Sequence, residues 1–179
     1  VARTSLEALD VCSVELVDPY GLALPPFSAG AHIDVHLPDG NTRQYSLCNN
    51  PAESHRYELA VLRTTDSRGG SVAMHKLEVG QYVRISEPKN HFALTPCAQH
   101  RVLLAGGIGI TPILCMAERL ANIGSSFTLH YCTRSAARTA FAERIRRSAF
   151  ADRVHFYHDD EPDTEKLDIA AVLAEPQVD

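Results

Sequence analysis

Apolar and polar residues alternate along the first half of the chain. Residues 31–37 place apolar side chains at every second position, which is the pattern of a half-buried strand. Turn residues follow at 38–41 and an extended pattern resumes over 42–48, so this stretch predicts a β-hairpin. Further elements are expected as strands within 6–17, at 57–63 and at 81–86, and as a short helix capped by Ser71 and running through 74–77. Short strands separated by turns predict an antiparallel sandwich or barrel.

The pattern changes near residue 98. Residues 101–105 form a continuous apolar run that ends in two glycines, as in a parallel strand buried on both faces. Thr111 fits the N-cap and Pro112 the first position of a helix that reaches about residue 122. Strands are expected at 127–132 and 154–158, and helices at 136–147 and 165–174. This alternation predicts a parallel sheet, and hence two domains, an antiparallel one over 1–97 and an α/β one over 98–179.

The composition narrows the class of protein. The 179 residues are 45% hydrophobic and 22% charged with a net charge of −5, which describes an ordinary globular chain and argues against a nucleic-acid binder. No apolar stretch reaches the length of a membrane span, so no membrane partner is expected. The five cysteines are irregularly spaced and form no CxxC, which favours reduced thiols and a cytoplasmic location.

Three stretches carry residues suited to binding phosphates or planar rings. The glycine-rich loop at 106–112 joins a strand to a helix, where free backbone N–H groups favour an anion, and a second glycine turn lies at 68–71. Arg43 and Tyr45 share one face of their strand, whereas Ser46 points to the other. Each stretch has a purely structural alternative, namely a tight turn, a loop glycine pair, or an exposed Arg and Tyr on a barrel. Together they fit one extended ligand or two adjacent ones.

Other chemistries find little support. The loop at 106–112 does not meet GxGxxG, because Pro112 stands where the third glycine belongs, and no Walker A, GxSxG or HExxH motif is present. His155 and His158 would face opposite sides of one strand, which is poor geometry for a shared metal. We expect His130 and His158 to be structural, and we expect no metal site in this chain.

The stretch Arg-Gln-Tyr-Ser-Leu at 43–47, followed by Gly-Gly-Ile-Gly-Ile-Thr-Pro at 106–112, resembles the ferredoxin–NADP reductase superfamily. The sequence of these motifs is most similar to that of the phthalate dioxygenase reductase group and, within it, to that of the vanillate O-demethylase oxidoreductases. Supporting stretches lie at 25–34, 67–71, 88–92 and 130–134. The resemblance covers essentially the whole chain and implies a two-domain fold, with an antiparallel Greek-key β-barrel that binds flavin and an α/β parallel-sheet domain that binds NAD. In that family, NADH-reduced flavin passes single electrons through a [2Fe-2S] cluster to a Rieske-type oxygenase.

The resemblance also implies roles for individual residues. Arg43 would hold the flavin phosphate, Tyr45 would lie along the isoalloxazine ring, and Ser46, the catalytic candidate, would hydrogen-bond near flavin N5. The other expected cofactor-binding residues are Asn49 at the flavin rim; Arg68, Gly69, Gly70 and Ser71 around the flavin phosphate; Gly106, Gly107, Gly109, Thr111 and Pro112 at the nicotinamide and pyrophosphate; and Thr133 and Arg134 nearer the ribose and adenine. FMN is implied rather than FAD, and NADH rather than NADPH.

The sequence departs from the family pattern at its C-terminal end. Family members continue into a Cys-Gly-Pro motif, an aromatic residue that covers the flavin, and a plant-type ferredoxin domain, none of which is found here. The chain also begins at Val1 rather than Met, and we therefore expect a fragment of the reductase component of a two-component aromatic oxygenase, with an incomplete α/β domain and the [2Fe-2S] centre in a missing domain. Two alternatives stay open: a truncated flavin-binding module without turnover, and an FAD-dependent flavin or ferredoxin-type reductase that needs no iron–sulfur domain.

Overall fold

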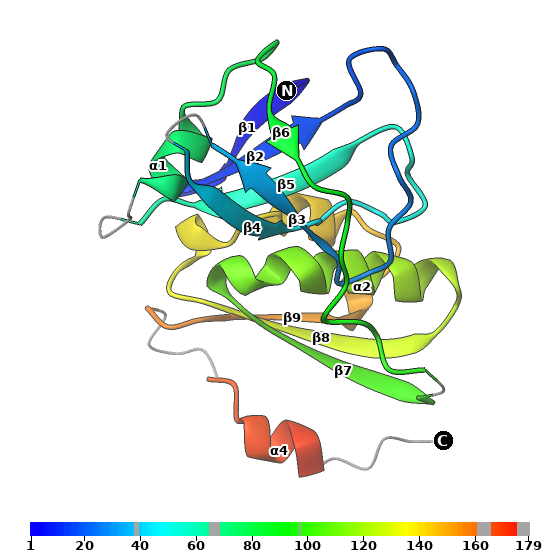
Figure 1. Ribbon diagram of the computed structural model, residues 1–179. Coiled ribbons are helices and arrows are strands. Elements are labelled where there is room, and N and C mark those ends of the chain that lie inside the picture. Colours follow the sequence, from blue (N-terminus) through cyan, green and yellow to red (C-terminus); the bar gives the residue numbers. More distant parts are fainter. Residues whose placement is uncertain (38–39, 65–68, 97, 161–165, 175–179) are drawn as a thin grey trace.

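A computed structural model describes residues 1–37, 40–64, 69–96, 98–160 and 166–174. In these parts, an antiparallel first half lies on one side of a central helix and a parallel sheet lies on the other (Figure 1). The layered order agrees with the predicted succession of an antiparallel half and an α/β half. The predicted domain boundary near residue 97 remains a prediction, because residue 97 itself lies outside the described residues.

The first half is built from two three-stranded antiparallel sheets. One contains β1 (Arg3–Ala8), β2 (Val11–Leu16) and β5 (Tyr57–Leu62), and the other contains β4 (Thr42–Ser46), β3 (His32–His36) and β6 (Arg84–Ile85), each in that order. The predicted hairpin is confirmed, since β3 and β4 pair in antiparallel register. In the parts of the chain that the structure describes, the two sheets stay separate and are not joined by hydrogen bonds into one closed barrel.

The strand expected within 6–17 is confirmed as β2, whereas β1 was not predicted. The chain turns back between these two strands at Asp10. Asp10 adopts a left-handed conformation with φ 63°, which is a conformation that Asp tolerates better than most residues. The strand expected over 81–86 shortens to the two residues of β6, which pair with β3.

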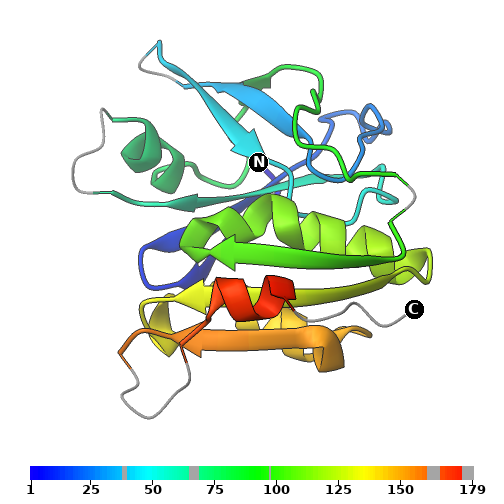
Figure 2. The same cartoon turned by 90° about the horizontal axis from the view of Figure 1, so that it is seen from below.

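The second half is a parallel sheet with its helices. The strands are β7 (His100–Gly106), β8 (Ser126–Thr133) and β9 (Val154–His158), in that order. Its helices are α2 (Ile110–Asn122), α3 (Ala142–Arg146) and α4 (Ile169–Ala174), with 3-10 turns at Gly107–Gly109, Ala136–Arg138 and Ala151–Arg153. Figure 2 shows the three strands side by side. The predicted βαβ alternation is therefore confirmed.

Both predicted helix caps are wrong. Helix α1 (Gly70–His75) begins after Gly69, whose φ of 91° suits glycine, and Ser71 lies inside the helix. Helix α2 begins after Gly109, because the preceding 3-10 turn extends directly into it. The Thr111 hydroxyl accordingly lies within the first turn of α2, where it donates a hydrogen bond to the Ile108 carbonyl oxygen at 3.1 Å.

The continuous helix predicted over 136–147 is also wrong. The chain leaves the helical conformation at Thr139, and Phe141 has a left-handed φ of 60°. The Thr139 hydroxyl donates to the Ser135 carbonyl oxygen at 3.0 Å, and the Phe141 ring is buried in the core. Burial of this aromatic side chain outweighs the local helical propensity, as tertiary contacts commonly do. Of the last predicted helix only α4 is seen, and Glu165 lies outside the described residues.

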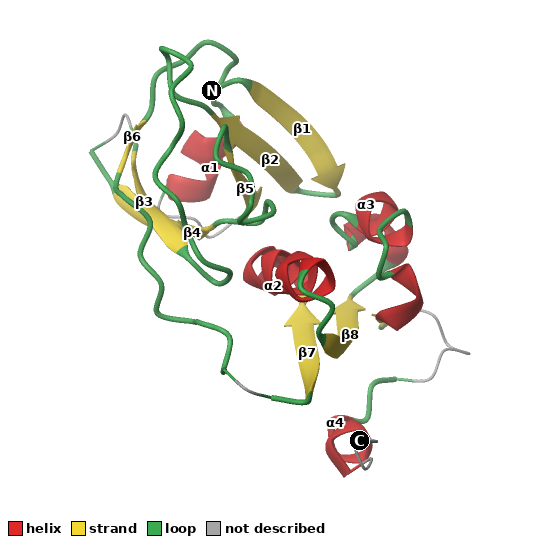
Figure 3. Cartoon of the chain, turned by 90° about the vertical axis from the view of Figure 1, so that its right-hand side faces the viewer, coloured by secondary structure: helices red, strands yellow, loops and turns green. Residues whose placement is uncertain are grey.

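One hydrophobic core joins the two halves through α2. The buried residues Ile113 and Met116 of this helix belong to the same cluster as Val11 and Cys48 of the antiparallel half. Figures 1 and 3 show α2 between the parallel sheet and that half. Contact is close at Gly30, where an added Cβ would lie 1.9 Å from the Phe92 carbonyl oxygen and 2.9 Å from Met116 Cε. The shared core therefore fixes the position of the antiparallel half relative to the parallel sheet.

Candidate functional site

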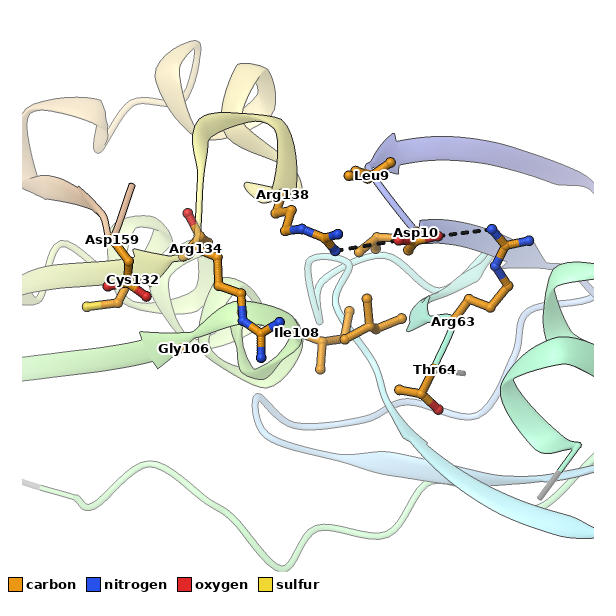
Figure 4. A pocket seen from close by; sticks show the side chains of 14 residues that line it. Leu9, Asp10, Arg63, Thr64, Gly106, Ile108, Cys132, Arg134, Arg138 and Asp159 are labelled. Atoms are coloured by element: carbon orange, nitrogen blue, oxygen red, sulfur yellow. Dashed lines mark hydrogen bonds and ion pairs between the residues drawn. The ribbon is translucent and has the colours of Figure 1, made fainter. Parts of the chain in front are cut away.

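A cleft of about 760 Å³ opens between the two halves, at the carboxyl ends of the parallel strands (Figure 4). Its lining consists of Leu9, Asp10, Val11, Leu62, Arg63, Thr64, Gly106, Gly107, Ile108, Cys132, Thr133, Arg134, Arg138 and Asp159. Ligands of open α/β sheets bind at this edge, because the strand-to-helix loops and helix N-termini gather there. The cleft is therefore the candidate site.

The parallel half supplies four of the predicted residues to this cleft, namely Gly106, Gly107, Thr133 and Arg134. A Cβ added at either glycine would meet no atom within 4 Å, so close packing within the protein does not require glycine there. The φ of 50° at Gly107 does favour it. The side of the loop that a Cβ would occupy is open, which leaves room for a ligand to approach the backbone.

The other predicted residues of this loop lie outside the lining of the cleft. Gly109 has open space around it and ends the 3-10 turn, whereas Thr111 is buried and bonded to the backbone of the loop. Pro112 lies in the first turn of α2, where its missing N–H costs no hydrogen bond. These three residues shape the loop, and the contacts of the loop with a ligand would come from Gly106 and Gly107.

The antiparallel half closes the cleft with a turn that the sequence analysis missed. The Asp10 carboxylate accepts hydrogen bonds from Arg63 at 3.0 Å and from Arg138 of the other half at 3.5 Å (Figure 4). The hydrogen bond from Arg63 is the main reason why the pKa of Asp10 is lowered. The backbone of Leu9 also donates to the Ala137 carbonyl oxygen at 2.8 Å. One signal was available in the sequence, since Arg63 ends a predicted strand, but nothing there indicated its partners.

The structure brings Arg43 against the second glycine turn. An added Cβ on Gly70 would lie 3.0 Å from both Cγ and Nε of Arg43, so the guanidinium arm covers the start of α1. The Ser71 hydroxyl accepts a hydrogen bond from the backbone N–H of Thr64 at 3.3 Å, and Thr64 lines the cleft. The arm of an arginine beside a glycine turn is a cradle suited to a phosphate, because both provide N–H donors.

Two further residues predicted to bind flavin, Tyr45 and Ser46, lie on the same strand as Arg43. Tyr45 is half-buried on the same strand as Arg43, and burial raises the pKa of its hydroxyl although Arg43 opposes the shift. Ser46 ends β4 and pairs with His32 of β3. None of these three β4 residues lines the cleft itself. Arg68, expected at the same phosphate, lies outside the described residues.

Asn49 is placed differently from the rest. It is fully buried, and its side-chain oxygen Oδ1 accepts a hydrogen bond from the backbone N–H of Glu58 at 3.0 Å. Its amide nitrogen donates to the Arg56 carbonyl oxygen at 3.1 Å and to Glu53 at 3.2 Å. These contacts tie the loop after β4 to the start of β5. The role expected for Asn49 at the flavin rim remains a prediction, and its observed contacts are structural.

Two histidines of the parallel sheet, His130 and His158, form hydrogen bonds within the protein, in agreement with the structural role predicted for them. His130 shares a hydrogen bond with the Tyr157 hydroxyl at 2.9 Å, and His158 shares one with the Thr133 hydroxyl at 3.0 Å. Across the described ranges, no group of three or more potential ligand side chains is arranged to hold a metal ion. The helices within those same ranges include none that is both long and apolar enough to cross a membrane.

Comparisons with known proteins identify similar sequences and a similar structure. No family model matches the chain. The chain is 57% identical to a vanillate O-demethylase oxidoreductase of Pseudomonas putida, over 97% of this chain and 54% of the relative. It is 42% identical to the phthalate dioxygenase reductase of Burkholderia cepacia, over 97% of this chain and 54% of the relative.

The whole of this chain is similar to part of a solved structure of phthalate dioxygenase reductase. That protein is a modular structure for electron transfer from pyridine nucleotides to [2Fe-2S]. It matches with a TM-score of 0.93 and 40% identity, over 99% of this chain and 56% of that one. The chain thus spans about half the length of the relatives it matches. The predicted resemblance is confirmed: this chain has the ferredoxin–NADP reductase-like fold, and its close homologues include a vanillate O-demethylase oxidoreductase and phthalate dioxygenase reductases.

Proposed function

We propose that this chain is the flavin- and NADH-binding part of an oxygenase reductase, which moves electrons from NADH through flavin towards a [2Fe-2S] centre. The observation that carries the proposal is the cleft between the two halves, with an open glycine loop on one side and the end of β5 on the other. The cradle of Arg43 and Gly70 lies beside it and is connected to it by the contact between Ser71 and Thr64. Two adjacent sites are what a reaction between two cofactors requires.

The cradle supports FMN as the flavin. A terminal phosphate dianion would receive donors from the Arg43 guanidinium and from the backbone at Gly69 and Gly70, where α1 begins. Tyr45 would cover the ring and Ser46 would present its hydroxyl near N5. FAD, whose phosphate is esterified to a further nucleotide, would need additional room at this turn.

The glycine loop supports a dinucleotide in the cleft. Gly106 and Gly107 would admit the pyrophosphate and nicotinamide close to the backbone, whereas Thr133 and Arg134 lie where the next parallel strand ends and would contact the ribose and adenine. When bound, flavin would supply the acceptance of a hydride with two electrons from NADH, leaving NAD⁺, and the transfer of these electrons one at a time to an acceptor. The residues of this chain supply binding, orientation and exclusion of water.

The names of the relatives support an oxygenase as the final acceptor, since one is a vanillate O-demethylase oxidoreductase and another a phthalate dioxygenase reductase. We propose that the acceptor is a Rieske-type oxygenase that acts on an aromatic compound. We also propose that this chain is located in the cytoplasm. The oxygenase would select the aromatic substrate, because none of the site residues described above would contact it.

The test is flavin reduction in the absence of oxygen. The chain is loaded with FMN, NADH or NADPH is added, and the loss of the oxidised flavin absorbance is followed. We expect NADH to bleach the bound flavin faster than NADPH does. The variant Gly106→Val should need more NADH while retaining the same flavin content, because its side chain would enter the cleft at a position whose φ of −119° valine can adopt. Bound flavin that NADH does not bleach would favour the binding module without turnover, and failure to bind flavin would reject the proposal.

A further inference from the structure

A buried charge cluster joins the two halves at the end of β5 remote from the cleft. Arg144 of α3 donates to Glu58 of β5 at 2.6 Å and to Glu118 of α2 at 2.8 and 3.0 Å. Its guanidinium also donates to the Cys48 carbonyl oxygen at 3.4 Å. The Glu58 side chain is only 4% exposed. We refer to Arg144, Glu58 and Glu118 as the Arg144 cluster.

The charges of the cluster are strongly coupled. Burial alone would lower the pKa of Arg144, but Glu118 and Glu58 outweigh this effect and raise it. Burial raises the pKa of Glu118, and Arg144 opposes that shift. A planar guanidinium that contacts two carboxylates imposes a definite geometry on the elements that carry them, because its N–H donors have fixed directions.

The elements joined by the cluster lead to both cofactor sites. Cys48 follows shortly after β4, the strand with the flavin residues, and its backbone N–H donates to the Glu58 carbonyl oxygen at 2.9 Å. Glu118 lies about two turns into α2, the helix that begins directly after the glycine loop at Gly107–Gly109. Arg144 therefore connects the end of the flavin strand with the helix that positions the nicotinamide loop.

A second contact between the halves lies at the cleft. There Arg138 reaches Asp10 at 3.5 Å, with side chains that are 37% and 27% exposed. The ion pairs of the Arg144 cluster are shorter and more numerous than this contact, and their side chains are more buried. Since exposed ion pairs contribute little, we infer that the cluster, together with the shared hydrophobic core, sets the relative orientation of the halves at this end of β5.

We propose that Arg144 is a positioning residue, which holds the flavin strand and the nicotinamide loop at the separation that the reaction requires and touches neither cofactor. This inference rests on the proposed function. Reacting groups lose about a hundredfold in rate when they are misplaced by about 1 Å. Loss of the Arg144 contacts should therefore slow the reduction of flavin by about tenfold or more, with little effect on the affinity for either cofactor.

The test compares Arg144→Gln and Arg144→Lys with the matched control Arg147→Gln. Arg147 follows α3 directly, is 82% exposed and pairs with Glu143. For each FMN-loaded chain, rapid mixing with NADH gives the limiting rate of flavin reduction and the half-saturating NADH concentration, and fluorescence quenching gives the FMN dissociation constant. Hydrogen–deuterium exchange of β5 and α2 gives a readout that does not depend on activity.

The expected result for Arg144→Gln is a limiting rate at least about tenfold lower, with both binding constants within about twofold of wild type and faster exchange in β5 and α2. Arg144→Lys should be intermediate, because an ammonium can contact one carboxylate but lacks the fork. Arg147→Gln should match wild type. A limiting rate within twofold of wild type would overturn the proposal, as would a loss that appears equally in the FMN affinity.

Two further experiments keep the test decisive if a variant does not fold or if FMN does not bind. If Arg144→Gln does not fold, Glu118→Gln replaces it, since this variant keeps the contact between Arg144 and Glu58 and should show the same loss of rate in weaker form. If wild-type chain fails to take up FMN, the proposed function is rejected, and the exchange experiment alone decides about Arg144. Faster exchange in Arg144→Gln but not in Arg147→Gln would then support the part of the proposal that Arg144 holds β5 and α2 together, and unchanged exchange would reject that part too.

Discussion

Replacement of Gly70 by alanine separates the proposed phosphate cradle from the stability of the fold. The new Cβ would lie 3.0 Å from Cγ and Nε of Arg43, whereas ordinary contacts of a Cβ begin near 3.4 Å. The Arg43 side chain must therefore move away by about 0.4 Å or more. This arm is flexible, so the backbone can stay in place while the guanidinium is displaced.

The expected effects have opposite signs. A hydrogen bond to a charged group contributes about 1.5–3 kcal/mol, so partial loss of the Arg43 contacts should weaken FMN binding by about tenfold, or about 1.4 kcal/mol. Gly70 is the first residue of α1 and its φ is not positive. Alanine there should leave the free energy of unfolding unchanged or raise it by up to about 1 kcal/mol, because it reduces the freedom of the unfolded chain.

Fluorescence-quenching titration with FMN and urea denaturation of the flavin-free chain measure the two quantities. Gly109→Ala is the matched control, because its Cβ would meet nothing within 4 Å and its φ is −60°. The control should bind FMN as wild type does. A folded Gly70→Ala chain with wild-type affinity for FMN would refute the assignment of the cradle to the flavin phosphate.

Three further predictions follow from burial. Tyr45→Ala removes a half-buried ring and should weaken retention of FMN during dialysis, so full retention would argue against a flavin-covering role. Leu120→Ala empties a fully buried position of α2 and should lower the free energy of unfolding by about 2–5 kcal/mol, measured in urea; a loss below about 1 kcal/mol would contradict the packing described. Burial raises the pKa of Cys115 to about 12, so iodoacetamide at pH 8 should leave this thiol unlabelled until the chain unfolds, and peptide mass analysis that finds early labelling would contradict this.

Local patterns predicted much of the fold. The alternation over 31–37 corresponds to β3, because the period of burial in a strand is written directly in its sequence. The apolar run before Gly106 corresponds to β7, but the expected burial on both faces is wrong, since burial alternates along this strand and Leu104 is 36% exposed in the part of the chain that the structure describes. The glycine loop after β7 was also predicted. The connection of strand to helix follows from residue type at that position, and Gly106 and Gly107 of this loop do line the cleft. Thr133 and Arg134 line it too, and they were expected from the family resemblance.

Contacts between distant segments could not be predicted in this way. Asp10 and Arg138 are 128 positions apart, and Glu58 and Arg144 are 86 apart, so no local period relates them. The break in the helix predicted over 136–147 has the same origin, since it depends on the burial of Phe141 against the rest of the core. Tertiary packing determines these features, and propensity alone favours the wrong structure.

The most direct test of the account is to identify the flavin that the chain binds. The purified chain is incubated with equal excesses of FMN and FAD, freed of unbound flavin, and denatured, and the released flavin is identified by chromatography and mass. The cradle of Arg43 and Gly70 predicts FMN at about one molecule per chain. FAD in its place would move the protein to the alternative class of reductases, and a chain that releases no flavin would contradict the central claim.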